Sequence, residues 1–299
     1  MFDHCPPQNE MQWQALRPAP ESFDFTPADA LVTAAEACQQ RLRGQSLCWH
    51  KSLPKWFQDV ATPDTAAQLL TEHIRRVAGR YARRVHSWDV VCEAIEVKDR
   101  RPDGLRITPW LHLLGPDYLE LAFRTASEAD PNALLTYNDY GLELDSPFNA
   151  RKREAVLNLL RSLRSRRVPL HALSLQAHLI ALNMTETPSW KGFHKFLDEV
   201  QKLNLQVFVT ALDVDDFHLA GIVRSRDSFV AGLYRDFLRN ILRHTSIKAV
   251  LTCGLSDRDT WLNSERRRQD GLPERPLPFD KDLKPKPAFD AMREELSRM

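Results

Sequence analysis

The 299-residue chain has no apolar run close to the ~18–20 residues that a membrane-spanning helix needs. Its first residues lack the apolar core of a secretory signal peptide, and they leave the localisation open. The net charge is only +1, with 41 Lys and Arg against 40 Asp and Glu. No global field therefore favours nucleic acid or an anionic membrane as a partner, and we expect neither.

Cysteine is scarce, with five residues spread along the chain and no CxxC pair. The odd count and the spacing argue against a disulfide framework and against a structural zinc site. Glycine-rich phosphate motifs are also missing, since no GxGxxG or GxxxxGK[ST] follows an apolar run. We therefore expect neither a metal nor a cofactor.

Short apolar runs alternate with longer segments of helical periodicity. The expected strands are 46–50, 88–92, 133–137, 172–176, 206–210 and 248–253. The expected helices are 27–43 with Thr26 as N-cap, 65–85, 118–129, 150–166, 192–203, 226–243 and 287–299. Hydrophobic residues make up 43% and charged residues 27%, the balance of an ordinary globular protein.

Strand–helix alternation predicts parallel strands joined by crossover helices. With a further strand near Phe2 there are about seven βα units, which favours an α/β fold of the (β/α)8 barrel type, as one domain over residues 1–299. In such a barrel, polar residues at the carboxyl ends of the strands line the site. These positions are His50, Cys92 with Glu93, Asn138 with Asp139, Gln176 with His178, Ala211 with Asp213, and Cys253.

Several of these strand ends resemble motifs of glycoside hydrolase family 10, the xylanase family. Residues 88–95 are similar to its Trp-Asp-Val-Val-Asn-Glu-Ala motif, and residues 209–214 to its Ile-Thr-Glu-Leu-Asp-Ile motif. Further similarities fall at 9–13, 44–56, 137–140, 176–178 and 251–261. The ordered set covers essentially the whole chain, so the resemblance is specific.

The resemblance implies a retaining endo-1,4-beta-xylanase that acts on a β-1,4-linked polysaccharide such as xylan. Such an enzyme uses two carboxyl groups roughly 5–5.5 Å apart, one as acid/base and one as nucleophile. Glu93 holds the acid/base position, but Ala211 replaces the nucleophile. Because a methyl group cannot form a glycosyl-enzyme bond, we expect hydrolysis to be impaired or lost.

The resemblance also assigns other positions. Asp213 and His178 hold positions that support the nucleophile. Retained sugar-binding positions are Asn9, Trp49, Tyr140, Gln176 and Trp261, and changed ones are Gln8, Gln12, Gln45, Ser52, Cys92, Gly141 and Cys253. We therefore expect a catalytically impaired relative that retains binding of a β-glycan. The resemblance further implies a usually secreted protein, which we expect to be a monomer and to lack the family's first strand and helix.

Two alternatives remain open. Asp213 lies two residues after Ala211, on the same face of its strand, and an inverting mechanism with Glu93 would need roughly 6.5–9.5 Å between the two carboxyls. The second alternative is a remodelled thiol or metal site built from cysteines and histidines at the strand ends, because these soft ligands suit zinc. Its candidates are Cys5, Cys48, Cys92, Cys253, His50 and His178.

Overall fold

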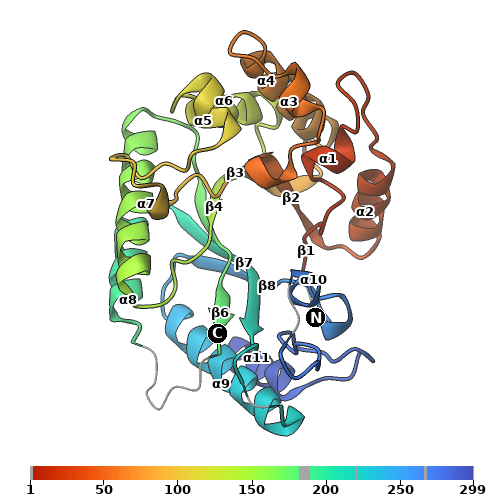
Figure 1. The fold of residues 1–299 in the computed structure, drawn as a ribbon, viewed down its shortest axis with the longest axis vertical. Helices are drawn as coiled ribbons and strands as arrows, with labels where there is room; N and C mark the ends of the chain where they lie inside the picture. Colours follow the sequence, from red (N-terminus) through yellow and green to blue (C-terminus); the bar gives the residue numbers. More distant parts are fainter. Residues whose placement is uncertain (1–2, 182–188, 220, 266–267, 299) are drawn as a thin grey trace. The chain divides into compact units, whose positions relative to one another are not determined.

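The computed structural model describes residues 3–181, 189–219, 221–265 and 268–298 (Figure 1). The chain divides into two compact units. Unit 1 comprises Met1–Asp139, Arg151–Ser174 and Leu203–Leu205, and unit 2 comprises Tyr140–Ala150, Leu175–Lys202 and Gln206–Met299. Among the described residues, no helix is long and apolar enough to cross a membrane.

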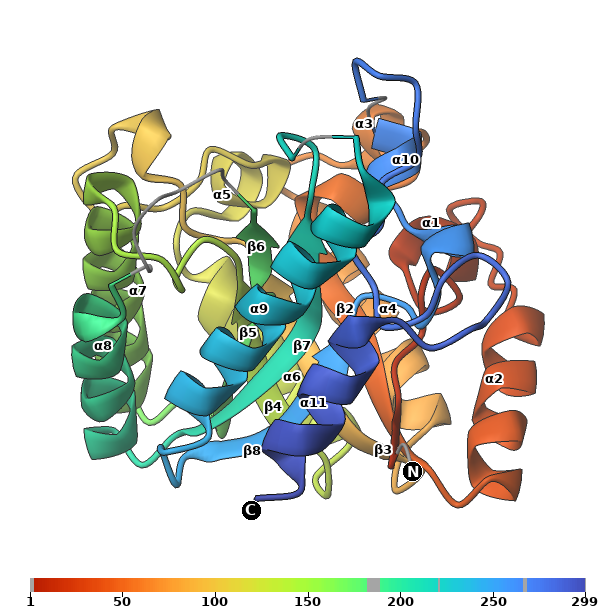
Figure 2. The same cartoon turned by 90° about the horizontal axis from the view of Figure 1, so that it is seen from below.

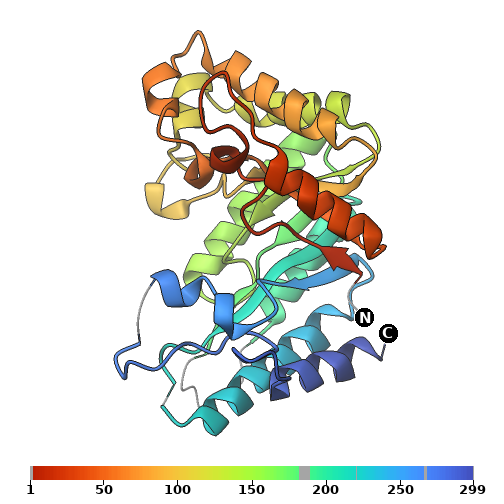
Figure 3. The same ribbon diagram turned by 90° about the vertical axis from the view of Figure 1, so that its right-hand side faces the viewer.

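Unit 1 is built on parallel strands in the order β1-β2-β3-β4-β5. The strands are β1 (His4–Cys5), β2 (Arg41–Trp49), β3 (Val85–Cys92), β4 (Leu134–Asp139) and β5 (Ala172–Leu175), whose last residue belongs to unit 2. The helices are α1 (Trp13–Leu16), α2 (Thr26–Ala37), α3 (Phe57–Val60), α4 (Ala66–Arg80), α5 (Pro109–Leu114), α6 (Tyr118–Ala129) and most of α7 (Pro147–Ser165). Helix α2 lies beside the short strand β1 (Figure 3).

The strands of unit 1 are held together by a buried polar network around Asp89. Arg43 donates to its Oδ1 at 2.7 Å and Ser174 donates to the same oxygen at 2.7 Å, while Asn138 donates to Oδ2 at 3.0 Å. These side chains come from β2, β5 and β4, so one carboxylate links four strands. Buried polar groups need such partners, and the network fixes the register in which Trp49 lies opposite Cys92.

Unit 2 is built around the long strand β7 (Gln206–Asp215), which pairs in parallel with β6 (His178–Ile180) and β8 (Ile247–Thr252). Its helices are α8 (Lys191–Lys202), α9 (Val223–Ile241), α10 (Leu262–Glu265) and α11 (Pro287–Leu296). Helices α9 and α11 lie side by side (Figure 2), and Arg239 is paired with Glu295 across them at 2.7 Å.

The predicted alternation of strands and helices is confirmed, but several boundaries were wrong. The expected helices 27–43 and 65–85 end at Ala37 and Arg80, because Gln39 and Arg83 adopt left-handed backbone conformations that terminate a helix. The residues that follow begin β2 and β3.

Three predictions concern the first or last residue of an element: the start of α2, the start of β1 and the end of the helix expected over 287–299. Thr26 is the first residue of α2 rather than its cap, and its N–H donates to Asp24 Oδ1 at 2.9 Å. The strand expected near Phe2 begins at His4, and Phe2 itself lies outside the described residues, as does Met299.

Candidate active site

Glu93 follows directly after β3, where the chain leaves the sheet. Its backbone has φ of 57°, its N–H donates to the carbonyl of Asn138 at 2.8 Å, and Arg106 Nε donates to its carbonyl at 2.7 Å. The residue is only 3% exposed. Glu93, the predicted acid/base residue, is therefore held by the end of β4 and by the loop after β3.

Two cations approach the Glu93 carboxylate. Lys51 Nζ lies 3.5 Å from Oε2 and Arg106 Nη2 lies 3.9 Å from it. Arg106 is shared with Glu96 at 3.3 Å, whereas Lys51 is 58% exposed. Glu93 is thus a nearly buried carboxyl group beside one largely buried and one exposed cation.

Strand β2 ends at Trp49, and His50 follows it directly. Lys51 lies over the Trp49 ring, 5.7 Å from its centroid, so one side chain contacts both Trp49 and Glu93. Burial lowers the pKa of His50 to about 4, with Arg106 adding to the shift and Glu93 opposing it. His50 is therefore a neutral imidazole at pH 7.

Asn9 lies in the turn before α1 of unit 1. It is exposed, its N–H donates to Glu10 Oε2 at 3.0 Å, and its carbonyl accepts from the N–H of Gln12 at 3.0 Å. These bonds hold Asn9 in the turn.

Three predicted residues of unit 2 form one cluster, the Asp213 cluster of His178, Asp213 and Trp261. Asp213 is fully buried on β7, opposite His178 of β6. His178 Nδ1 lies 2.8 Å from Oδ1, and Trp261 Nε1 donates to Oδ2 at 2.8 Å. The two rings meet edge to face with centroids 5.2 Å apart. Both oxygens of Asp213 are thus engaged, one by His178, which the sequence grouped with it, and the other by Trp261, which the sequence assigned to sugar binding.

Ala211 lies on β7 two residues before Asp213, and it is half-buried. Its N–H donates to the carbonyl of Gln176 at 3.1 Å, so the position that the resemblance assigns to the nucleophile lies beside the end of β5. Tyr140, at the start of unit 2, is half-buried as well.

Glu143 was missed by the sequence analysis. It is buried, and its carboxylate accepts from the N–H groups of Ala177 and Leu142, both at 2.9 Å. Burial raises the pKa of Glu143, against the effect of these two donors. Ala177 has φ of 60°, so Glu143 secures the bend that separates β5 from His178. A carboxylate that follows a strand end by four residues offered no local signal of this role.

The cysteines give no support to a thiol or metal centre. Burial raises the pKa of Cys48, Cys92 and Cys253, with Asp213 adding to the shift at Cys253. These groups are therefore protonated thiols rather than thiolate nucleophiles. Within the described residues, no group of three or more His, Cys, Asp and Glu side chains could hold a metal ion.

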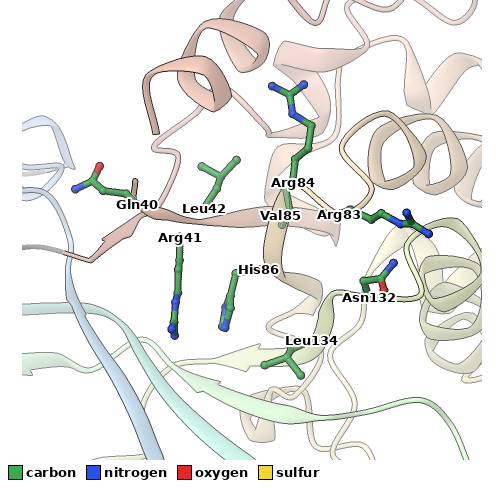
Figure 4. A pocket seen from close by; sticks show the side chains of 9 residues that line it. All are labelled: Gln40, Arg41, Leu42, Arg83, Arg84, Val85, His86, Asn132 and Leu134. Atoms are coloured by element: carbon green, nitrogen blue, oxygen red, sulfur yellow. The ribbon is translucent and has the colours of Figure 1, made fainter. Parts of the chain in front are cut away.

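A pocket of about 590 Å³ lies at the amino ends of β2, β3 and β4 (Figure 4). In the figure, the Arg41 and His86 side chains point the same way, while Arg83 extends toward Asn132. Its lining residues are Gln40, Arg41, Leu42, Arg83, Arg84, Val85, His86, Asn132 and Leu134. Because the strands are parallel, this pocket lies at the opposite end of the unit 1 strands from Glu93, and none of the predicted site residues line it.

The family model of glycosyl hydrolase family 10 matches residues 1–295. The chain belongs to this family. It is 35% identical to endo-1,4-beta-xylanase B of Paenibacillus barcinonensis over 301 residues, covering 94% of this chain and 85% of the relative. Beta-1,4-xylanase of Dictyoglomus thermophilum is 33% identical over 296 residues, with 96% and 80% covered.

Solved structures of the family confirm the predicted (β/α)8 barrel fold. Native xylanase 10B from Thermotoga maritima matches with a TM-score of 0.88 at 30% identity, covering 99% of this chain and 87% of that one. Xylanase 10B from Thermotoga petrophila, solved in complex with xylobiose, matches with a TM-score of 0.86 at 30% identity, covering 99% and 86%. An intracellular xylanase from Thermoanaerobacterium saccharolyticum, solved as a Glu→Ala mutant in complex with xylotetraose, matches with a TM-score of 0.83 at 29% identity, covering 97% and 87%.

Proposed function

We propose that this family 10 chain binds β-1,4-linked xylo-oligosaccharides and hydrolyses them weakly or not at all. The observation that carries the proposal is Ala211: a methyl group occupies the nucleophile position of β7, two residues from an Asp213 cluster whose hydrogen bonds are complete. The groups that would support a nucleophile are ordered, and the attacking group itself is absent.

The relatives support the binding part of the proposal. A family 10 xylanase has been solved with xylobiose, and a Glu→Ala mutant of another has been solved with xylotetraose. The second case indicates that a barrel of this family can hold a xylo-oligosaccharide after one glutamate is reduced to alanine.

Aromatic side chains supply the expected contact surface. Trp261 is 38% exposed, and its indole N–H is fixed by Asp213, so the ring is oriented while one part of it stays accessible. Trp49 and Tyr140 are half-buried. Rings that are held in place lose little entropy on binding, and the apolar faces of pyranose rings can stack on them.

The inverting alternative with Glu93 and Asp213 is less well supported. A general base must orient a water molecule, whereas Oδ1 and Oδ2 of Asp213 each already have a ring nitrogen at 2.8 Å. Asp213 is also fully buried. This bonding suits a supporting role better than the activation of water.

The test combines calorimetry and catalysis on the intact chain. Xylotetraose should give a saturable binding heat, while xylan should release reducing sugar at a rate far below that of an active family member. The matched variant Trp261→Ala should weaken binding, and Arg293→Gln, on the exposed face of α11, should leave it unchanged. No heat at millimolar ligand would refute binding. Strong hydrolysis that is lost in both Glu93→Gln and Asp213→Asn would instead support the inverting mechanism.

A further inference from the structure

Two histidines of unit 2 that are not among the candidate site residues face one another. His194 lies on α8 and His244 follows the end of α9, and both are half-buried. His194 Nδ1 lies 2.8 Å from His244 Nε2. The ring centroids are 5.1 Å apart and the planes differ by only 24°, so the two inner nitrogens meet edge to edge.

The outer nitrogen of His194 is a donor. Its Nε2 lies 3.1 Å from Oδ1 of Asn240, and Asn240 Nδ2 donates to the carbonyl of Asp236 at 2.7 Å. That second bond fixes the orientation of the amide, so Oδ1 must accept and His194 Nε2 must carry the proton.

The outer nitrogen of His244 faces a carboxylate. Its Nδ1 lies 3.5 Å from Oδ1 of Asp198, which is one helical turn after His194 on α8. An ionised carboxylate can only accept, so a proton on His244 Nδ1 is favoured.

A neutral imidazole carries one proton. His194 holds it on Nε2, and in the tautomer that faces Asp198 His244 holds it on Nδ1, so that both outer nitrogens are protonated. The inner nitrogens, His194 Nδ1 and His244 Nε2, then present two lone pairs to each other at 2.8 Å. Such an arrangement calls for a positive centre between them. Imidazole nitrogen is a preferred ligand of zinc, copper and nickel, and a metal-bound histidine commonly donates its other N–H to a carboxylate or a carbonyl.

We propose that His194 and His244 form a two-imidazole binding site for a divalent transition metal ion of the zinc class, with water completing the coordination. Zn–N bonds of about 2.0–2.1 Å in a tetrahedral site place two nitrogens about 3.3 Å apart, so the two inner nitrogens would move about 0.5 Å further apart as the rings turn their lone pairs toward the metal. The His244 ring is 11% exposed and Asp198 is 60% exposed, which leaves a path for metal and water.

The site has only two protein ligands. No larger His, Cys, Asp and Glu group able to hold a metal occurs in the part of the chain that the structure describes. Binding is therefore weaker than in structural zinc sites with four protein ligands. It joins α8 to the end of α9, and occupancy stabilises unit 2.

The experiment uses the full chain purified without a histidine tag. Calorimetry should show one saturable Zn²⁺ site, and the melting temperature should rise with Zn²⁺ concentration but not with Mg²⁺, which prefers oxygen ligands. His194→Ala and His244→Ala should each weaken Zn²⁺ binding at least tenfold and remove the thermal shift. Asn240→Ala keeps both ligands but removes an orienting bond, and it should weaken binding by about tenfold.

His112→Ala is the matched control, because His112 is an exposed histidine on α5 of unit 1. It should leave Zn²⁺ binding unchanged. The proposal is overturned if the wild-type chain binds no Zn²⁺, which would assign the positive centre to a shared proton. It is equally overturned if binding survives in both alanine variants.

Discussion

Restoring a carboxylate at position 211 tests the central chemical inference. In Ala211→Glu, the new side chain starts from a half-buried position on β7, two residues before Asp213. Asp213 is already bonded to His178 and Trp261, so the supporting side chains need no rearrangement. Removing a catalytic nucleophile typically costs on the order of 10⁶ in kcat, equivalent to about 8 kcal/mol.

We do not expect the full factor of about 10⁶ to return, because the resemblance assigns Cys92, Cys253 and Gln45 to changed sugar-binding positions. Several changed sugar contacts at about 1 kcal/mol each would withhold roughly 10²–10³. We therefore expect Ala211→Glu to raise kcat on xylan by roughly 10³–10⁴. The assay is the initial rate of reducing-sugar release, with xylotetraose affinity measured in parallel.

Ala211→Gln is the matched control, because glutamine has the size of glutamate but cannot act as the nucleophile. It should remain as slow as the wild-type chain. The reasoning fails if Ala211→Glu folds, binds xylotetraose and is still no faster than Ala211→Gln. That result would show that the chain has lost more of the reaction geometry than one carboxylate.

Three further predictions concern local structure. Gly44→Ala should destabilise the chain by roughly 3 kcal/mol in urea unfolding, since a Cβ there would overlap the Trp88 ring, whereas Gly79→Ala on α4 meets no atom within 4 Å and should stabilise by about 0.5–1 kcal/mol. The free energy of unfolding should fall as the pH drops from about 6.5 toward 4, because His50 and His86 bind protons in the unfolded state while their pKa values in the fold are about 4. His50→Gln should make the free energy of unfolding depend less steeply on pH in this range, and an unchanged slope would contradict the prediction. Asp213→Asn should weaken xylotetraose binding several-fold, since an amide cannot accept at both positions from His178 and Trp261, and an unchanged affinity would separate the Asp213 cluster from sugar binding.

The fold could be predicted from the sequence because its strands are short runs of buried residues, and polar residues follow directly at their carboxyl ends. Trp88 to Cys92 is buried throughout, as expected for a parallel strand covered on both faces, and Glu93 follows it directly. The ends of helices were harder to predict. Gln39 and Arg83 adopt left-handed backbone conformations although neither is glycine, so the local sequence contained no signal that the helices end before them.

Contacts made over long sequence separations could not be predicted. Arg106 reaches Glu93 from a loop thirteen residues later, and Glu143 secures the backbone of Ala177 across 34 residues. His194 and His244 are separated by 50 residues, and neither lies in a motif. Each depends on the path of the folded chain, which periodicity and residue type do not encode.

The survival of the Asp213 cluster beside Ala211 has a structural explanation as well as a catalytic one. Asp213 is fully buried, and losing either His178 or Trp261 would leave a buried carboxylate oxygen without its donor, at a cost of about 1–3 kcal/mol or more. Selection for stability alone would thus keep all three residues even in a chain that does not hydrolyse xylan. Stability does not require the accessible part of the Trp261 ring, which is 38% exposed and free to meet a ligand. A conservative Trp261→Phe variant separates the two explanations further, because it removes the indole donor while keeping an aromatic face. If sugar binding is a retained function, Trp261→Phe should lose stability but keep much of the affinity for xylotetraose, whereas Trp261→Ala should lose both.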